Sequence, residues 1–108
     1  MIRSIAAILA LLSTTPVITE TVQVRGRGPI ELESYACTDT PRSTIVQRVC
    51  YDEARSHLLV SSGGTYSEYC GLSASTFEAF VIASSMGHFF RQRIASVAQF
   101  SCNRAGTN

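Results

Sequence analysis

Three separate stretches in the middle of the chain have the pattern of β-strands. The first alternates Ile45, Val49 and Tyr51 with Val46, Arg48 and Cys50, and the second is centred on an apolar run over residues 58–60. These stretches cover residues 45–51, 57–61 and 65–69. Alternation with a period of two is typical of β-strands. The polar pair Asp52-Glu53 and the run Ser62-Gly63-Gly64 mark the breaks, and linkers this short do not allow the crossover that parallel pairing requires. The pattern therefore predicts three short antiparallel strands in a meander.

The period of the apolar residues changes to about 3.6 after Cys70, which indicates helices. A first helix is predicted from about Ser73 to Ser84, and Ser75 with Glu78 has the form of a capping box. A second helix is predicted from about Met86, with Ser85 as its N-cap. The apolar positions that share a face are Phe77, Phe80 and Val81 in the first helix and Met86, Phe89, Phe90, Ile94 and Val97 in the second. Because both faces need burial against the sheet, we expect an α+β fold, a small three-stranded antiparallel sheet packed against two C-terminal helices.

Residues 20–42 show no comparable pattern. The run Arg-Gly-Arg-Gly-Pro at 25–29 and Pro41 are typical of turns, so this segment is predicted to be a loosely structured lead-in. Only Ile30 and Leu32, which alternate with glutamates, indicate a short edge strand. The folded domain is expected over residues 43–103, with a C-terminal tail at 104–108.

The first nineteen residues have the order of a secretory signal peptide. Arg3 precedes an unbroken apolar run over residues 5–12, and polar residues follow it. Such a run is typical of the apolar region of a signal peptide, whereas a membrane-spanning helix needs about 20 apolar residues. We therefore predict a signal peptide at residues 1–19, export to the periplasm or the medium, and no membrane span after cleavage.

Composition limits the chemistry that this chain can perform. It has 108 residues, which is about one domain's worth, and 45% of them are hydrophobic, as expected for a folded protein. All nine basic residues are arginines, which excludes catalysis by a lysine amine. Removing Arg3 with the signal peptide takes the formal net charge from +1 to zero. A neutral domain disfavours nucleic acid as the ligand, because affinity for nucleic acid comes largely from neutralising phosphates.

The four cysteines are Cys37, Cys50, Cys70 and Cys102. An even number in a small exported domain predicts two disulfides. No pair has the C-x-x-C spacing, and only two histidines are present, so neither a metal site nor a catalytic thiol is expected. Two connectivities stay open. Cys50 with Cys70 and Cys37 with Cys102 is the simplest arrangement and is placed first, although strands separated by a middle strand lie too far apart for a bridge unless the chain bends past Tyr69. Cys70 with Cys102 and Cys37 with Cys50 follows closely behind it, and the third connectivity is the least favoured.

The order of residues in this region resembles the KTSC domain, a short module named after the C-terminus of some lysyl-tRNA synthetases. The resemblance covers about residues 43–100. It rests on Ser43-x-Ile45-x3-Val49-x-Tyr51-Asp52, the Gly63 turn, the tyrosine pair, Leu72, Phe77, Ala83-x-Ser85-x-Gly87-x-Phe89-Phe90 and Ile94. The family pattern centres on a Tyr-x-Tyr, whereas here two residues separate Tyr66 from Tyr69, which indicates an extra residue or bulge and rings on opposite sides of the strand.

The resemblance implies little about activity, since RNA binding has been suggested for the family rather than established. It also implies an exported, single-domain bacterial variant. We expect a binding module for a protein or envelope polymer, with nucleic-acid binding as the alternative and an enzyme less favoured. No cofactor and no metal are expected. The candidate binding surface comprises Tyr66, Tyr69, His88, Arg91 and Arg93.

Overall fold

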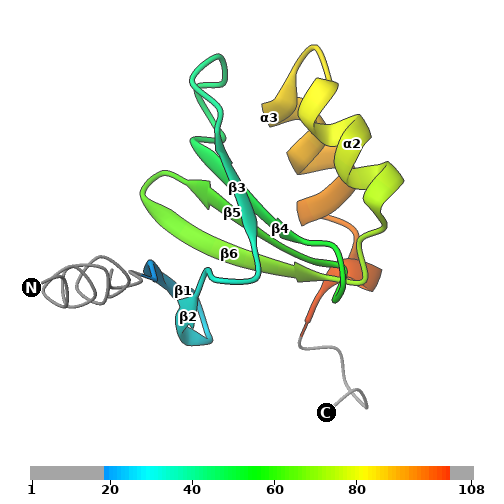
Figure 1. Ribbon diagram of the computed structural model, residues 1–108. Helices are drawn as coiled ribbons and strands as arrows, with labels where there is room; N and C mark the ends of the chain where they lie inside the picture. The colour runs from blue at the N-terminus through cyan, green and yellow to red at the C-terminus, as the bar shows by residue number, and fades with distance from the viewer. Residues whose placement is uncertain (1–18, 103–108) are drawn as a thin grey trace, which may run out of the picture.

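The computed structural model describes residues 19–102 (Figure 1). The predicted signal peptide, apart from Thr19, and the predicted tail lie outside the described residues. Six strands come first: β1 Thr21–Val24, β2 Gly28–Glu31, β3 Ala36–Asp39, β4 Arg48–Asp52, β5 His57–Ser62 and β6 Thr65–Cys70. Four helical segments follow: α2 Ala74–Ile82, α3 Met86–Phe89, the π-helical turn η1 Phe90–Ala95 and the 3₁₀ turn η2 Ala98–Phe100. Within the described residues, no helix has the length and apolar character needed to cross a membrane.

The strands form one sheet in the order β2-β1-β6-β5-β4-β3. The predicted meander is present, because β4 pairs with β5 and β5 with β6, both antiparallel. The prediction of a three-stranded sheet is wrong, because residues 20–42 supply three further strands. Their glycines serve as turns: Gly26 and Gly28 have φ of 74° and 94°, a left-handed backbone that glycine adopts without steric cost. β2 lies at one edge of the sheet, as the alternation around Ile30 predicted.

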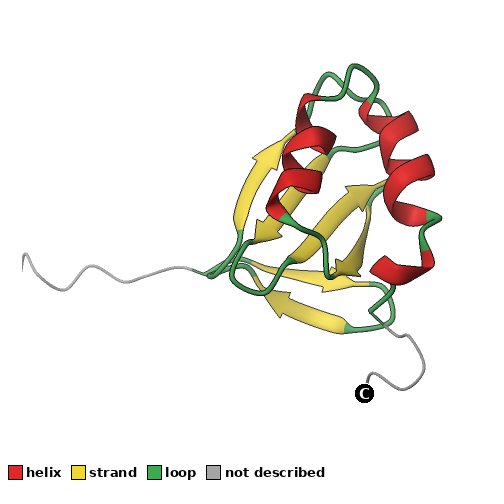
Figure 2. Ribbon diagram, turned by 90° about the vertical axis from the view of Figure 1, so that its right-hand side faces the viewer, coloured by secondary structure: helices red, strands yellow, loops and turns green. Residues whose placement is uncertain are grey.

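The sheet curls and buries a separate apolar cluster on each face. The helices cover one face, as Figures 1 and 2 show. The main core there consists of Val46, Val49, Tyr51, Leu58, Val60, Leu72, Phe80, Met86, Phe90, Ile94 and Phe100. Inside the curl, a second core joins strands from both ends of the sheet: Val22, Val24, Leu32, Cys50 and Leu59. Because successive strand residues point to opposite faces, β4 and β5 supply side chains to both cores.

The helices begin and end differently from the sequence pattern in two places. The side chain of Ser73 caps α2 by accepting a hydrogen bond from the Thr76 amide, so the predicted capping box at Ser75 is wrong. Ser85 caps α3 as predicted, by accepting from the His88 amide. The predicted second helix is α-helical for only one turn and then widens into η1. Its buried residues Met86, Phe90 and Ile94 recur every four residues, a spacing that drifts around an α-helix but suits a wider turn.

Gly87 allows the close approach of the segment before β4 to α3. A Cβ on Gly87 would lie 2.9 Å from Cδ1 and 3.0 Å from Cβ of Ile45. We expect Gly87→Ala to lower the free energy of unfolding by about 1 to 3 kcal/mol, because overpacking outweighs the better helix propensity of alanine. Urea denaturation measures the stability loss caused by Gly87→Ala in the wild-type protein and in the Ile45→Ala variant. The loss should be smaller in the Ile45→Ala variant, because the shortened side chain leaves room for the added Cβ. Equal losses in both backgrounds would contradict the steric explanation.

Candidate functional site

The two tyrosines of the predicted surface lie on opposite faces of β6. Tyr66 packs against the core inside the curl, and its hydroxyl accepts a hydrogen bond from Arg48 at 3.2 Å. Tyr69 packs on the helix side, where its ring meets Phe90 edge to face with 5.6 Å between centroids. The opposite orientation is as predicted, but its predicted cause is not present: β5 and β6 pair residue by residue from His57–Cys70 to Ser62–Thr65, without a bulge. Tyr66 and Tyr69 are three positions apart, and residues an odd number of positions apart on a regular strand point to opposite faces, so the spacing alone explains their orientation.

The three predicted residues of the second helix are exposed but face two different pockets. His88 and Arg91 line a pocket of about 280 Å³ between the segment before β4 and the start of α3. Arg93 lines another pocket, of about 400 Å³, and its guanidinium carbon lies 5.8 Å from the centre of the Phe89 ring. The five predicted residues therefore do not form one surface, and the structure brings together only His88 and Arg91.

The pocket at His88 and Arg91 is cationic and rich in hydroxyl groups, and we call it the Arg91 pocket. Its lining consists of Arg42, Ser43, Thr44, Ile45, Ser84, Ser85, Met86, Gly87, His88 and Arg91, none of them acidic. Arg42 is held in place by donating hydrogen bonds to the carbonyls of Val81 and Ala83 at the end of α2, at 2.6 and 3.0 Å. Ser43 Oγ accepts from the amide of Val46 at 3.0 Å, which orders the opposite wall.

Arg91 differs from several other arginines in having no carboxylate partner among residues 19–102. Arg27 pairs with Glu68, Arg48 with Glu20 and Arg55 with Asp52. These pairs neutralise the arginines of the sheet. The Arg91 pocket thus keeps two guanidinium groups, one imidazole and several hydroxyls without a neighbouring negative charge. Such a set of donors is suited to a carboxylate, phosphate or sulfate group.

A second polar cluster lies at the other end of the molecule, and sequence reasoning missed it. Glu68 on β6 accepts hydrogen bonds from Arg27 at 2.9 and 3.0 Å and contacts His57 Nε2 on β5 at 2.8 Å. His57 Nδ1 in turn contacts the hydroxyl of Tyr35, which precedes β3. We call this the Glu68 network. The side chains of Glu68 and His57 are only 7% and 12% exposed, whereas that of Arg27 is 50% exposed.

Charge is balanced within the Glu68 network. Burial acts to raise the pKa of Glu68, but the hydrogen bonds from Arg27 and His57 outweigh it, and the pKa lies below its usual value. The hydrogen bond to Glu68 raises the pKa of Arg27. Burial also raises the pKa of Tyr35, which keeps its phenol protonated at neutral pH. The network is therefore an ionised Glu–Arg pair with a histidine and a neutral tyrosine attached.

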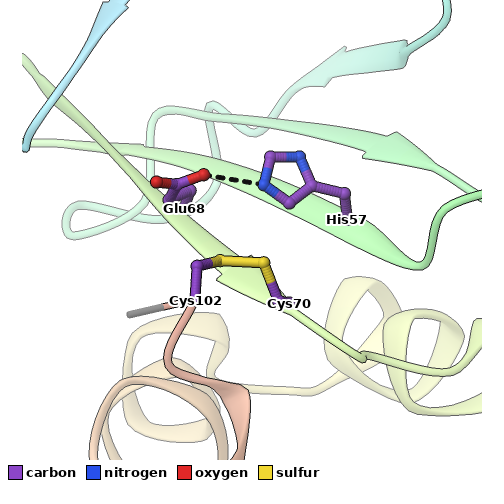
Figure 3. A group of neighbouring side chains, drawn as sticks. All are labelled: His57, Glu68, Cys70 and Cys102. Carbon is purple, nitrogen blue, oxygen red and sulfur yellow. Dashed lines mark hydrogen bonds and ion pairs between the residues drawn. A yellow bond between two sulfur atoms is a disulfide. The ribbon is translucent and has the colours of Figure 1, made fainter. Parts of the chain in front are cut away.

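The disulfides join Cys37 to Cys50 and Cys70 to Cys102. The arrangement placed first, with Cys50 bonded to Cys70, is therefore wrong, and the one placed second is correct. Cys37 lies directly opposite Cys50 in the β3–β4 register, with 4.0 Å between the Cα atoms, because the lead-in folds into β3. Cys70 ends β6 and meets Cys102 after the helices, close to Glu68 and His57 (Figure 3).

A signal for the Glu68 network was present in the strand alternation. Glu68 and Cys70 are two apart on β6, and His57 pairs directly with Cys70. Residues two apart on a strand share a face, so the three side chains share the face opposite Leu58 and Tyr69. The contributions of Arg27 and Tyr35 carried no such signal, because both belong to the segment predicted to be loosely structured.

The comparisons with known proteins agree with the resemblance seen in the sequence. The sequence model of the KTSC domain matches residues 42–97, more than half of the chain. No curated protein and no solved structure gives a match. The matched region includes β4 to β6, both helices and the whole lining of the Arg91 pocket, whereas β1 to β3 lie before it. The chain belongs to the KTSC domain family.

Proposed function

We propose that the protein is an exported module that binds an anionic group of an envelope polymer or protein in the Arg91 pocket. One observation carries this proposal: Arg42, His88 and Arg91 converge on a pocket of about 280 Å³ whose lining contains no acidic side chain. The ligand group is a carboxylate, phosphate or sulfate, since guanidinium groups donate two hydrogen bonds to such groups in a favourable geometry.

The size of the pocket limits the ligand to a small group. Sites for drug-sized molecules are typically about 300 to 1,000 Å³, so a pocket of about 280 Å³ holds one acidic unit rather than a large cofactor. A polymer with repeated acidic units presents many such groups. Binding of this kind gains strength by engaging several copies of the protein along one polymer.

Two features support the exported location. Disulfides persist in oxidising compartments, and both cysteine pairs of this chain are bridged. The apolar run after Arg3 has the length and order of a signal peptide. Together they favour the envelope or the medium as the place where the pocket meets its ligand.

The proposal is tested by calorimetric titration with a carboxylated polysaccharide and with short polyphosphate. Arg91→Gln should weaken the binding of at least one of them about 10- to 100-fold, the effect of losing a hydrogen bond from a charged donor. Arg93→Gln is the matched control, because it removes the same charge from the same helix but faces another pocket. Arg93→Gln should leave the affinity unchanged.

Two results would reject this function. If neither polymer binds, or if both variants weaken binding equally, the Arg91 pocket is not a specific site. Tight binding of single-stranded RNA that falls steeply with salt would support the nucleic-acid alternative instead. We expect weak RNA binding at physiological salt, since the chain without its first nineteen residues has no net positive charge.

A further inference from the structure

Four side chains with metal-ligating atoms meet at the end of β6. One ligand atom from each of His57, Glu68, Cys70 and Cys102 lies within 4.8 Å of all the others. Figure 3 shows these four side chains together. While the two sulfurs are bonded to each other, neither is a thiolate, and thiolates are the form in which cysteine binds metals. We propose that a dithiol reductant converts this group into a zinc site with two sulfur, one nitrogen and one oxygen ligand.

The chemistry of the conversion balances. The dithiol supplies two electrons and two protons, the Cys70–Cys102 bond breaks to give two thiols, and the dithiol becomes a disulfide. Zinc then displaces the two thiol protons and binds both thiolates. Two thiolates, an imidazole and a carboxylate are all established zinc ligands, and the thiolates favour zinc over magnesium or calcium.

The spacing of the four groups suits a tetrahedral ion. Zinc–sulfur bonds of about 2.3 Å and zinc–nitrogen bonds of about 2.0 Å place tetrahedral ligand atoms roughly 3.3 to 3.8 Å apart. The atoms of this cluster are within 4.8 Å already, and breaking the sulfur–sulfur bond allows the sulfurs to separate to that distance. Three of the four residues lie on the paired strands β5 and β6, which fixes their backbone positions.

Groups that orient zinc ligands are also in place. Histidines that bind metals usually hydrogen-bond through the other ring nitrogen. Here Nε2 of His57 faces Glu68, while Nδ1 contacts the Tyr35 hydroxyl. Oε2 of Glu68 accepts from Arg27 Nε at 3.0 Å, and Oε1 accepts from Arg27 Nη2 at 2.9 Å and also contacts His57 Nε2. Because a carboxylate oxygen has two lone pairs, Oε1 can keep its hydrogen bond from Arg27 and bind the metal once zinc replaces its contact with His57.

The two disulfides differ in access to a reductant. Cys70 and Cys102 are both partly exposed. Cys37 is partly exposed as well, but its partner Cys50 is fully buried, with 0% exposure, inside the second core, so only one sulfur of that bridge can be approached. Thiol–disulfide exchange requires attack on a sulfur atom, so access controls its rate. Mild reduction is therefore expected to open Cys70–Cys102 first and leave Cys37–Cys50 intact.

The test is a cobalt titration of the purified full chain before and after mild treatment with a dithiol, followed by displacement with zinc. Mass spectrometry of alkylated peptides identifies the opened disulfide. The reduced protein should bind one cobalt ion about 100-fold more tightly than the oxidised protein, with the visible absorption of tetrahedral thiolate coordination. His57→Gln should weaken this binding at least about 10-fold and alter the spectrum. His88→Gln, the other histidine of the chain, should change neither.

Any of three results would overturn the proposal. These are equal metal binding by oxidised and reduced protein, equal behaviour of the two histidine variants, and loss of the folded circular dichroism spectrum in reduced protein supplied with zinc. The variant Cys37→Ala/Cys50→Ala gives a second measurement, since it retains all four ligands and should still bind after reduction. Because His88 and Arg91 take no part in this site, failure here leaves the function of the Arg91 pocket unaffected.

Discussion

Phe80→Ala is expected to lower the free energy of unfolding by about 3 to 5 kcal/mol, the range for truncating a buried aromatic residue. Phe80 is completely buried, with 0% exposure. Its ring stacks against Phe89 and Phe90, with centroids 5.7 and 6.2 Å away. The residue thus connects α2 to α3 and η1, and its removal leaves a cavity in the main core. Urea denaturation followed by circular dichroism measures the loss.

Ile82 provides the control on the same helix. It is 78% exposed, so Ile82→Ala removes a comparable apolar group without creating a cavity, and the expected change is within about 0.5 kcal/mol. A similar loss for both variants would show that a general weakening of α2, rather than the cavity at Phe80, causes the loss of stability.

We expect the replacement of both Cys70 and Cys102 with alanine to lower the free energy of unfolding by about 3 to 4 kcal/mol. The bridge spans a sequence separation of 32 residues, and the entropy that a cross-link of this length removes from the unfolded chain corresponds to that amount. The loop contains all of α2, α3, η1 and η2, so without the bridge these elements are held to the rest of the domain by packing and by hydrogen bonds such as those from Arg42 to α2. The measurement is urea denaturation under non-reducing conditions.

The interpretation depends on the remaining disulfide. A free-thiol assay should find none in the double variant, which shows that Cys37–Cys50 still forms. The urea slope should rise, since an unfolded chain without the cross-link exposes more surface. A loss below about 1 kcal/mol would contradict this explanation, because it would mean that the cross-link removes little entropy from the unfolded chain.

The part of the fold predicted from the sequence is the part with strong periodicity. β5 alternates Leu58 and Val60 towards the helices with Leu59 towards the curl, and buried strands of this kind have a clear signal. The strands of residues 20–42 have four residues each, and β3 has no buried residue. Their positions depend on pairing with partners distant in sequence, which periodicity does not reveal. In β1, Val22 and Val24 do alternate with polar residues, but two apolar positions are too few to predict a strand.

The residues that carry the family resemblance explain why it predicted fold better than function. Tyr51 donates a hydrogen bond to the Leu72 carbonyl at 2.6 Å and stacks on Phe77. Gly87 makes room for Ile45. These residues hold strands to helices and present no reactive group. By contrast, the Glu68 network joins residues up to 41 positions apart, and its existence depends on a sheet register that a single sequence does not specify.

The hairpin of β1 and β2 has consequences for how this molecule opens. Both disulfides lie outside it, and its strand register with the rest of the sheet is one parallel pair, Val24 with Tyr66. Its other attachments include the side chains of Val22 and Val24 in the second core and the ion pair of Arg27 with Glu68. Local opening follows the regions with the least cross-linking and pairing, so the hairpin is the natural first unit to detach. Its detachment exposes the backbone of β6 and uncouples Arg27 from Glu68. Detachment would leave β6 as an unpaired edge strand, the kind of edge at which a second chain can pair.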